Sequence, residues 1–381
     1  MGKFFKKKLK NGITVLFEKR DLDVVSASIT NKFGGAYEET QIKGIAHVIE
    51  HLLFTGTKTR SHEDISREIE KKGGVLNAFT AHEVTSFWFK LPSEHLFSGL
   101  DILVDMLKNP KFEKKKFEKE KKVILEEINM YHDNPRNHVF DMIEKNLYES
   151  PFGELVIGNK ESVSGLKRDF TAEYFKKVYS PENYIVCVVG NADFDKICEY
   201  FERNFKAEGK KPAMLTIKKK NGESVEKRTH LDQAHLVFAV HAPLPSDEDC
   251  YAIDVLDAYL ANGMSSKLFL EIREKRGLAY AVTSSLEGEK NYAFYTIYVG
   301  TTKDALPEVK KLILEGFENV KGMSEKDLKE AKERVLGLNK VRAEESINVM
   351  NELMFEEISG DANDYYKYNE KINKVGLEQV K

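Results

Sequence analysis

The chain has 381 residues, of which 41% are hydrophobic, so it is long enough for two domains with sizeable cores. The 59 basic and 62 acidic residues nearly cancel, and lysine runs such as Lys6–Lys8 are predicted to be solvated rather than to bind nucleic acid. A membrane-spanning apolar run and a signal peptide are both missing, and Cys187, Cys198 and Cys250 lack metal or disulfide spacing. We therefore expect a soluble, cytoplasmic protein with reduced thiols that binds neither nucleic acid nor membrane.

The coarse pattern alternates strands and helices along the chain. Strands are predicted at 13–17 and 24–30, helices at 44–54 and 62–72, one or two strands at 75–91, helices at 96–107 and 114–131, a strand at 184–189, a helix at 195–205 and a strand at 236–240. Between 206 and 231 the sequence becomes polar and rich in turn residues. We predict one domain at 1–208, a linker at 209–230 and a second domain at 231–381.

The second half of the chain repeats the first. Shifted by 203 positions, residues 68–80 lie over 271–283 with six of thirteen identical. The elements on both sides follow in the same order, which indicates two homologous α+β domains, each a mostly antiparallel sheet packed against helices. Residues 372–381 resemble a helix that begins as the chain ends, so the second domain either lacks its closing helix and strand or the chain is a shortened form.

The most informative motif lies in the helix predicted at 44–54. His47, Glu50 and His51 spell H-x-x-E-H, and residues spaced i, i+3 and i+4 share one face of a helix. Their neighbours are apolar, so burial of these three side chains would be costly without a partner. The pattern is the inverzincin motif, which places two zinc-binding imidazoles beside a carboxylate.

The repeat shows that only the first domain carries this motif. Aligning Gly56 with Gly263 puts Asp254, Asp257 and Ala258 where the first domain has its two histidines and the glutamate. The second domain is therefore not expected to bind zinc with this helix.

A catalytic zinc needs a third protein ligand and an open position for water. The helix predicted at 114–131 and the residue before it offer several carboxylates: Glu113, Glu118, Glu120, Glu126 and Glu127. Periodicity alone does not choose among them.

Segments 44–57, 73–91, 117–128 and 270–283 resemble the pitrilysin (insulinase) family of zinc peptidases. The chain is most similar to its short two-domain members, which include the subunits of the mitochondrial processing peptidase. This resemblance implies one Zn²⁺ per chain, held by His47, His51 and Glu127, with Glu120 orienting a histidine and Glu50 acting as general base.

The resemblance also implies where substrate binds. A strand in 73–80 would form an exposed sheet edge beside the zinc, with Asn77, Ala78 and Phe79 contacting a substrate added as a further strand. Arg273 and Tyr280, seven residues apart, match a substrate-binding pair that short members generally receive from the other subunit, so we expect a homodimer. His82 and Glu83 are expected to be surface residues.

The residues and the resemblance together predict a zinc metallopeptidase, specifically an endopeptidase that hydrolyses peptides or unfolded polypeptide segments. Zinc lowers the pKa of its bound water towards about 7, and Glu50 is placed to take the proton. The alternatives are a non-catalytic structural subunit, a partner-dependent subunit of a peptidase-like complex, and a zinc-binding module without hydrolysis. The complete set His47, Glu50, His51 and Glu127 argues against the first alternative. The presence of Arg273 and Tyr280 disfavours the second, and a module without hydrolysis would have no use for Glu50.

Overall fold

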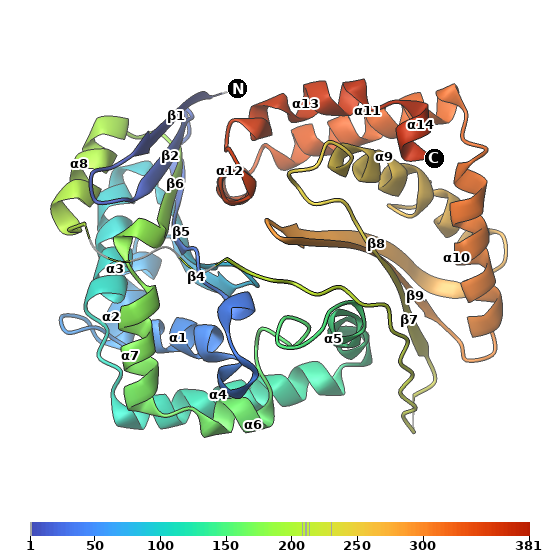
Figure 1. The fold of residues 1–381 in the computed structure, drawn as a ribbon. Coiled ribbons are helices and arrows are strands. Elements are labelled where there is room, and N and C mark those ends of the chain that lie inside the picture. Colours follow the sequence, from blue (N-terminus) through green and yellow to red (C-terminus); the bar gives the residue numbers. More distant parts are fainter. Residues whose placement is uncertain (1, 208, 210–211, 213, 230) are drawn as a thin grey trace. The chain divides into compact units, whose positions relative to one another are not determined.

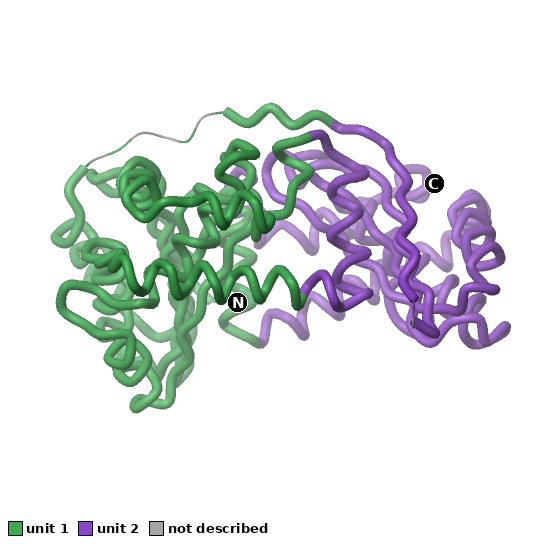
Figure 2. The backbone as a smooth tube through the Cα atoms, turned by 90° about the horizontal axis from the view of Figure 1, so that it is seen from below, with its two compact units in different colours: residues 1–130, 150–218, 345–358 green, residues 131–149, 219–344, 359–381 purple. Residues whose placement is uncertain are grey.

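The computed structural model describes residues 2–381 except 208, 210, 211, 213 and 230. The chain forms two compact units (Figure 2): unit 1 comprises residues 1–130, 150–218 and 345–358, and unit 2 comprises 131–149, 219–344 and 359–381. Each unit thus takes one short segment from the opposite half of the chain. The domain boundaries predicted from the sequence, with domains at 1–208 and 231–381 and a linker at 209–230, stay a prediction. Of these ranges, residues 208, 210, 211, 213 and 230 lie outside the described residues.

The described residues of unit 1 form a six-stranded sheet in the order β1-β2-β6-β3-β5-β4 (Figure 1). In chain order the strands are β1 (Lys3–Lys8), β2 (Thr14–Lys19), β3 (Val24–Asn31), β4 (Val75–Thr80), β5 (Thr85–Pro92) and β6 (Tyr184–Gly190). Only β2 and β6 pair in parallel, and the other neighbours are antiparallel. The order leaves β4 at one edge of the sheet.

Both faces of the unit 1 sheet are covered, as the central strand β3 shows. Its residues Val25, Ala27 and Ile29 point into the hydrophobic core, which α1 (Ile45–Phe54) and α3 (Leu96–Lys108) complete. The alternate residues face the other way. There Ser26 contacts Ser346, at the start of α12 (Ser346–Ser359), through their hydroxyls at 2.8 Å. A segment from far along the chain therefore closes the second face of this sheet.

Unit 1 contains further helices besides α1, α3 and α12. They are α2 (His62–Glu70), α4 (Lys114–Asp133, whose last turn is assigned to unit 2), α6 (Lys160–Gly165), α7 (Arg168–Val178) and α8 (Phe194–Asn204). Short 3₁₀ turns lie at Gly35–Tyr37, Thr40–Ile42, Ser93–His95 and Pro181–Asn183. Helix α2 begins with a capping box between Ser61 and Asp64, which satisfies backbone donors at its first turn.

Among its described residues, unit 2 has a three-stranded antiparallel sheet in the order β7-β9-β8. Its strands are β7 (Ala234–His241), β8 (Ala279–Glu289) and β9 (Tyr292–Thr301), and its helices are α5 (Pro135–Leu147), α9 (Cys250–Leu260), α10 (Leu306–Val320), α11 (Glu325–Arg342), α13 (Asp364–Lys374) and α14 (Leu377–Val380), with a π-helical turn at Phe269–Glu274. Helix α5 packs against β7, which explains why this early segment belongs with the second unit.

The prediction of two α+β domains with mostly antiparallel sheets is confirmed. Residues 75–91 form two strands, as one of the alternatives allowed. The expectation that His82 and Glu83 are surface residues is wrong, because both are buried in the β4–β5 turn, where the ring of Phe152 stacks on His82 at 4.6 Å. Among the described residues, no helix combines the length and apolar character that crossing a membrane requires.

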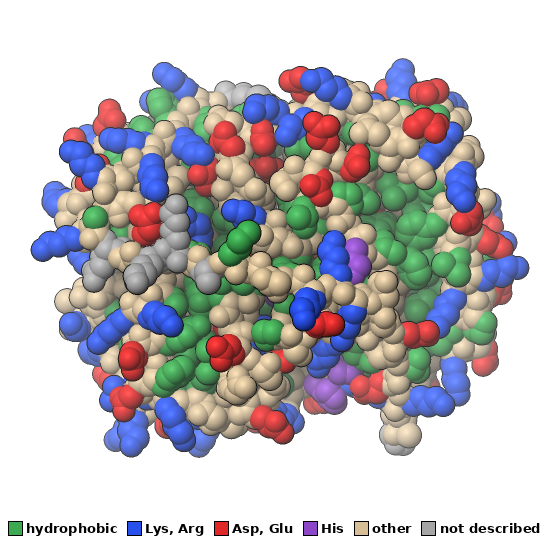
Figure 3. Space-filling view, viewed as in Figure 1, with side chains coloured by type: hydrophobic (Ala, Val, Ile, Leu, Met, Phe, Trp, Pro, Cys, Tyr) green, Lys and Arg blue, Asp and Glu red, His purple; other side chains and the backbone are tan. Residues whose placement is uncertain are grey.

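Charges of both signs are interspersed over the face seen in Figure 3, with hydrophobic side chains between them. This pattern agrees with the near-zero net charge, since neither sign dominates the visible surface.

Candidate metal centre

The N-terminus of α1 is fixed by a buried carboxylate. Gly44 precedes the helix with a positive φ of 93°, a conformation that glycine adopts readily. Glu38 accepts hydrogen bonds from the backbone N–H groups of Gly44 at 2.8 Å and Ala46 at 2.7 Å. These are the donors that a helix leaves unpaired at its start, so Glu38 locks the turn from which His47 projects.

A buried lysine lies beside this carboxylate. Lys43 is fully buried, and its Nζ donates to the carbonyl oxygens of Gly35 and Pro151 at 2.8 and 2.9 Å. Burial raises the pKa of Glu38 to about 7, although the charge of Lys43 and the two backbone hydrogen bonds oppose that rise. The helix start is therefore held by ionisable groups with no access to solvent.

The three residues predicted as zinc ligands converge in the structure. One ligand atom from each of His47, His51 and Glu127 lies within 4.8 Å of the others. The Nε2 atoms of His47 and His51 are 3.8 and 3.6 Å from Oε2 of Glu127. The two rings meet edge to face, with their centroids 4.7 Å apart. Helix α4 thus presents Glu127 to the histidine face of α1.

Glu120 lies on the same face of α4 as Glu127, about two turns earlier, and its carboxylate faces Nδ1 of His51. Its Oε2 is 3.5 Å from Nδ1 of His51. A carboxylate at Nδ1 orients the ring and leaves Nε2 free to coordinate. The pairing with His51 lowers the pKa of Glu120.

The protonation tendencies fit a cation held at this point. Burial, and then the charge of His51, lowers the pKa of His47 to about 3, so its imidazole is neutral and its nitrogens can donate electron pairs. Burial opposes protonation of His51 as well, but Glu120, Glu50 and Glu127 outweigh it and raise its pKa. Burial raises the pKa of Glu127 against the charge of His51. The carboxylates Glu120 and Glu127, with the neutral imidazole of His47 and the second imidazole of His51, are donor types that Zn²⁺ binds, and a cation would take the place of the proton on His51.

A further sign is an unpaired polar atom. Nδ1 of His47 is buried and has no hydrogen-bond partner among the described residues. The imidazole of His47 therefore carries a desolvation cost that no hydrogen bond at Nδ1 offsets, and a metal bound through Nε2, which faces Glu127, would offset that cost from the other side of the ring. The residues present therefore fit the metal that the motif implies.

Glu50 lies on α1, between His47 and His51, and lines a hollow in the surface. Its Oε2 accepts a hydrogen bond from the hydroxyl of Thr80, on β4, at 2.5 Å. Burial raises the pKa of Glu50 despite this bond. The hollow, of about 300 Å³, is lined by Glu50, His51, Phe54, Thr55, His62, Asn77, Lys116, Lys119 and Glu120. A reacting group bound there would meet both a histidine of the centre and a carboxylate able to accept a proton.

Strand β4 carries the three residues predicted to contact substrate. It pairs only with β5 and packs against α1, so its other edge is unpaired within the described sheet. Asn77 folds its Oδ1 back onto the N–H of Ala78 at 2.8 Å, and the ring of Phe79 stacks on Phe355 of α12. The backbone of an edge strand thus runs past the hollow beside Glu50.

Arg273 and Tyr280 lie in unit 2, next to each other. The guanidinium of Arg273 is centred 5.4 Å from the ring of Tyr280 and 5.0 Å from that of Phe269. Tyr280 is 80% exposed. A pair that presents its ring to solvent can contact another molecule, and its part in the centre of unit 1 stays a prediction.

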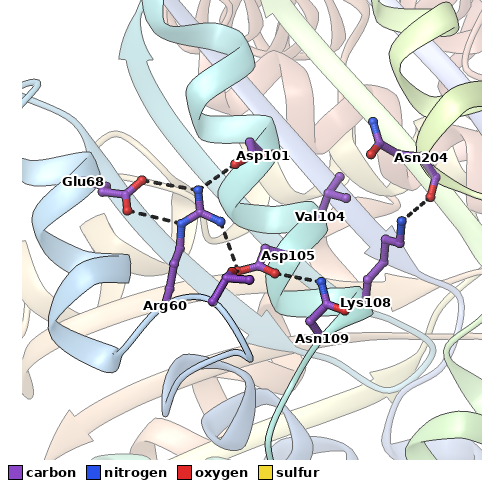
Figure 4. A pocket seen from close by; sticks show the side chains of 9 residues that line it. Arg60, Glu68, Asp101, Val104, Asp105, Lys108, Asn109 and Asn204 are labelled. Atoms are coloured by element: carbon purple, nitrogen blue, oxygen red, sulfur yellow. Dashed lines mark hydrogen bonds and ion pairs between the residues drawn. The ribbon is translucent and has the colours of Figure 1, made fainter.

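A hollow of about 430 Å³ elsewhere in unit 1 has a different character (Figure 4). The guanidinium of Arg60, which lines this hollow, contacts Asp101 at 2.6 Å, Asp105 at 3.0 Å and Glu68 at 3.3 Å. Lys108 is turned to the carbonyl oxygen of Asn204. Because each charge has a partner, we interpret this cluster as an ion-pair network that holds α2 to α3.

Sequence reasoning did not find Glu38, Lys43 or Thr80. Glu38 lies outside the three-residue span of a capping box, so no local pattern marks it. Thr80 could have been noticed only by knowing that β4 lies against α1. His62 and the lysines of the hollow likewise gave no signal.

Comparison with known proteins extends the resemblance. Residues 14–159 match the model described as "Insulinase (Peptidase family M16)", and residues 165–335 match the one described as "Peptidase M16 inactive domain". A Bacillus subtilis protein named "Uncharacterized zinc protease YmxG" is 31% identical over 387 residues, covering 97% of this chain and 92% of the relative. A Rickettsia felis protein named "Uncharacterized zinc protease" is 35% identical over 304 residues, covering 78% of this chain and 74% of the relative.

The fold is also shared with solved structures. A protease from Helicobacter pylori superposes with a TM-score of 0.92 at 22% identity, covering all of this chain and 95% of the other. At that identity the likeness concerns the fold.

Proposed function

The chain belongs to the insulinase family of peptidases, family M16, and we propose that it is a zinc-dependent endopeptidase that hydrolyses peptides or unfolded polypeptide segments. The observation that carries the proposal is the convergence of His47, His51 and Glu127 within 4.8 Å, with Glu50 between the two histidines on α1. The zinc-protease names of the relatives support the same conclusion.

In this proposal His47, His51 and Glu127 hold one Zn²⁺ per chain, and Glu120 orients His51. The bound metal supplies Lewis-acid polarisation of the scissile carbonyl and a water acidified towards neutral pH. The protein's contribution is to fix three donors and leave room beside them, which the hollow next to Glu50 provides.

Glu50 is the general base. It takes a proton from the attacking water and returns it to the leaving amine. Because burial raises its pKa, the carboxyl accepts a proton more readily than an exposed glutamate would. The hydroxyl of Thr80 holds Oε2, so Oε1 is the oxygen free to act.

The unpaired edge of β4 is the proposed docking site for substrate. An extended peptide added there would form backbone hydrogen bonds, with Asn77, Ala78 and Phe79 beside it, and would place a peptide bond over the hollow. Recognition through the backbone accepts many sequences but requires an extended chain. Peptides and unfolded segments meet that requirement, whereas folded surfaces do not.

We further propose that the protein acts as a homodimer in the cytoplasm, with Arg273 and Tyr280 of one chain completing the site of the other. The exposure of Tyr280 and its contact with Arg273 support a role in binding a second molecule. Three free cysteines are consistent with a reducing compartment.

The test is cleavage of fluorogenic peptides and of an unfolded protein by the zinc-loaded chain, before and after chelation and after zinc is restored. We expect activity that chelation abolishes and zinc recovers. A chain that holds zinc at this centre and cleaves neither substrate would instead be a non-catalytic or partner-dependent subunit.

A further inference from the structure

A second cluster of metal-binding side chains lies in unit 2, outside the proposed hydrolytic site. One ligand atom from each of His132, His138 and Glu226 lies within 4.8 Å of the others. Nε2 of His138 is 2.7 Å from Oε2 of Glu226. The rings of His132 and His138 meet edge to face with centroids 4.7 Å apart and an interplanar angle of 66°.

This arrangement repeats that of the first centre. There the two rings are also 4.7 Å apart, at 65°, and the third donor is again a glutamate. The two clusters differ in how they are built, since the first places both histidines on one helix. From this shared donor set we propose that His132, His138 and Glu226 form a second binding site for a divalent cation of the zinc class.

The turn between two helices brings the histidines together. His132 lies in the last turn of α4, and His138 lies in the first turns of α5. Asn134 caps α5 by accepting from the N–H groups of Arg136 and Asn137, and Pro135 begins the helix. The cap and the proline define the turn between α4 and α5, and this local turn is what brings the two rings together.

Glu226 comes from residues 219–229, a segment without helix or strand that is largely exposed. Arg228 holds this segment in place, donating from Nε to Oε1 of Glu226 at 2.6 Å and from Nη1 to the carbonyl oxygen of His132 at 2.6 Å. Oε1 is therefore occupied, and Oε2 is the oxygen that faces the histidines.

Two further charges set the strength of the site. Asp133 contributes a carboxylate oxygen 3.4 Å from Nδ1 of His132, which favours an electron-rich ring. Nη2 of Arg228 lies 3.4 Å from Nε2 of His132 and competes with a cation for that nitrogen. The site is therefore weaker than the buried centre on α1.

The consequence of binding is structural. A cation held by these three side chains would cross-link the end of α4, the start of α5 and the segment 219–229 within unit 2. The start of this stretch is attached through its backbone, by the N–H of Lys220 to the carbonyl oxygen of Leu147 at 2.8 Å, but the part around Glu226 is attached through side chains, such as Asn146 to Ser224 at 2.8 Å, and a cation would order it further. No step of the proposed hydrolysis uses the site.

The test counts zinc in a four-member set of full-length chains: wild type, His47→Ala/His51→Ala, His138→Ala, and the triple variant. Each is loaded with Zn²⁺, freed of loosely held metal and analysed by mass spectrometry. We expect two, one, one and no equivalents. Glu226→Gln should match His138→Ala, and Glu223→Gln, from the same exposed segment but paired with Lys310, is the matched control that keeps both.

A second readout concerns the segment itself. In the His47→Ala/His51→Ala background, Zn²⁺ should slow amide hydrogen exchange in 219–229, and Glu226→Gln should remove that effect. Zinc affinity at this site should fall by at least about 100-fold in His138→Ala, because losing a ligand costs more than losing a residue that only orients one. The second site would be overturned, without affecting the first, if the wild type held only one equivalent of zinc and His138→Ala kept it. It would also be overturned if zinc left amide hydrogen exchange in 219–229 unchanged. A wild-type equivalent lost only in His138→Ala would instead contradict the centre on α1.

Discussion

Helix α1 of unit 1 and helix α9 of unit 2 hold corresponding places in the two halves of the sequence but use their polar positions differently. On α9, Asp254 accepts from the hydroxyl of Tyr368 at 2.7 Å, and Asp257 accepts from that of Tyr295 at 2.8 Å. Both carboxylates are thus tied into their own unit by hydrogen bonds. On α1, His47 and His51 face a carboxylate at 3.6–3.8 Å, too far for hydrogen bonds.

The difference separates what the fold needs from what the chemistry needs. A helix in this place can be stabilised by ordinary polar contacts to neighbouring elements, as α9 is. The histidine face of α1 leaves a buried nitrogen unpaired and gathers carboxylates whose pKa values burial raises. Those features cost stability unless a cation binds, so metal chemistry is the better explanation for them.

The largest expected effect follows from removing a ligand on α1. His51→Ala should lose the zinc of this centre and lower peptide cleavage by about 10³-fold or more, because the metal contributes several kcal/mol to the transition state. Zinc content and initial rates measure this. The control is Asp254→Ala on α9, which should retain both, and equal losses in the two variants would erase the distinction between the helices.

For the free energy of unfolding, a substitution on α9 is expected to have the larger effect and one on α1 the smaller. Asp257→Ala should lower the free energy of unfolding by about 3 kcal/mol, because the buried hydroxyl of Tyr295 loses its acceptor and Asn262 loses a partner at 2.8 Å. Glu50→Ala, at the corresponding position of α1, should cost less than 1 kcal/mol. Denaturant unfolding followed by circular dichroism compares them, and an equal cost would mean that Glu50 is also a structural residue.

The buried carboxylate at the start of α1 should make stability depend on pH. The pKa of Glu38 is raised to about 7 from its usual 4.5, so the unfolded chain releases this proton first as pH rises. Stability of the wild type relative to Glu38→Gln should therefore fall by about 3 kcal/mol between pH 4.5 and 7 and change little outside that window. Parallel stability profiles for the two chains would show that Lys43 and His82 keep Glu38 ionised throughout.

A smaller change is expected from Glu120. Glu120→Gln removes the carboxylate beside Nδ1 of His51 and should weaken zinc binding 10- to 100-fold while the ligands remain. Competition with a chromophoric chelator measures the affinity. Glu118→Gln, on the same helix and exposed, is the matched control. An unchanged affinity in Glu120→Gln would show that His51 needs no outer partner.

The features that could be predicted from the sequence are those that depend on residues close together in the chain. The motif face of α1 follows from helical spacing alone, and the repeat with Asp254, Asp257 and Ala258 isolates it. Glu127 could not be chosen from spacing, because five carboxylates compete on one stretch, and the family resemblance selected it.

What sequence could not supply depends on contacts between distant segments. Glu38 and Thr80 reach the centre through tertiary packing, and His82 is buried because Phe152, seventy residues later, covers its turn. The exchange of 131–149 and 345–358 between the units has no local signature either. An edge strand is likewise defined by the order of the whole sheet, so the position of β4 needed the fold.

The central claim is that α1 carries hydrolytic chemistry rather than a structural cluster, and Glu50→Gln tests it most directly. Zinc content and peptide cleavage are measured on the same sample, so that loss of metal and loss of the base are distinguished. We predict full zinc content at the α1 centre with cleavage reduced about 10²- to 10⁴-fold. A zinc-loaded Glu50→Gln chain that cleaves at the wild-type rate would contradict the claim.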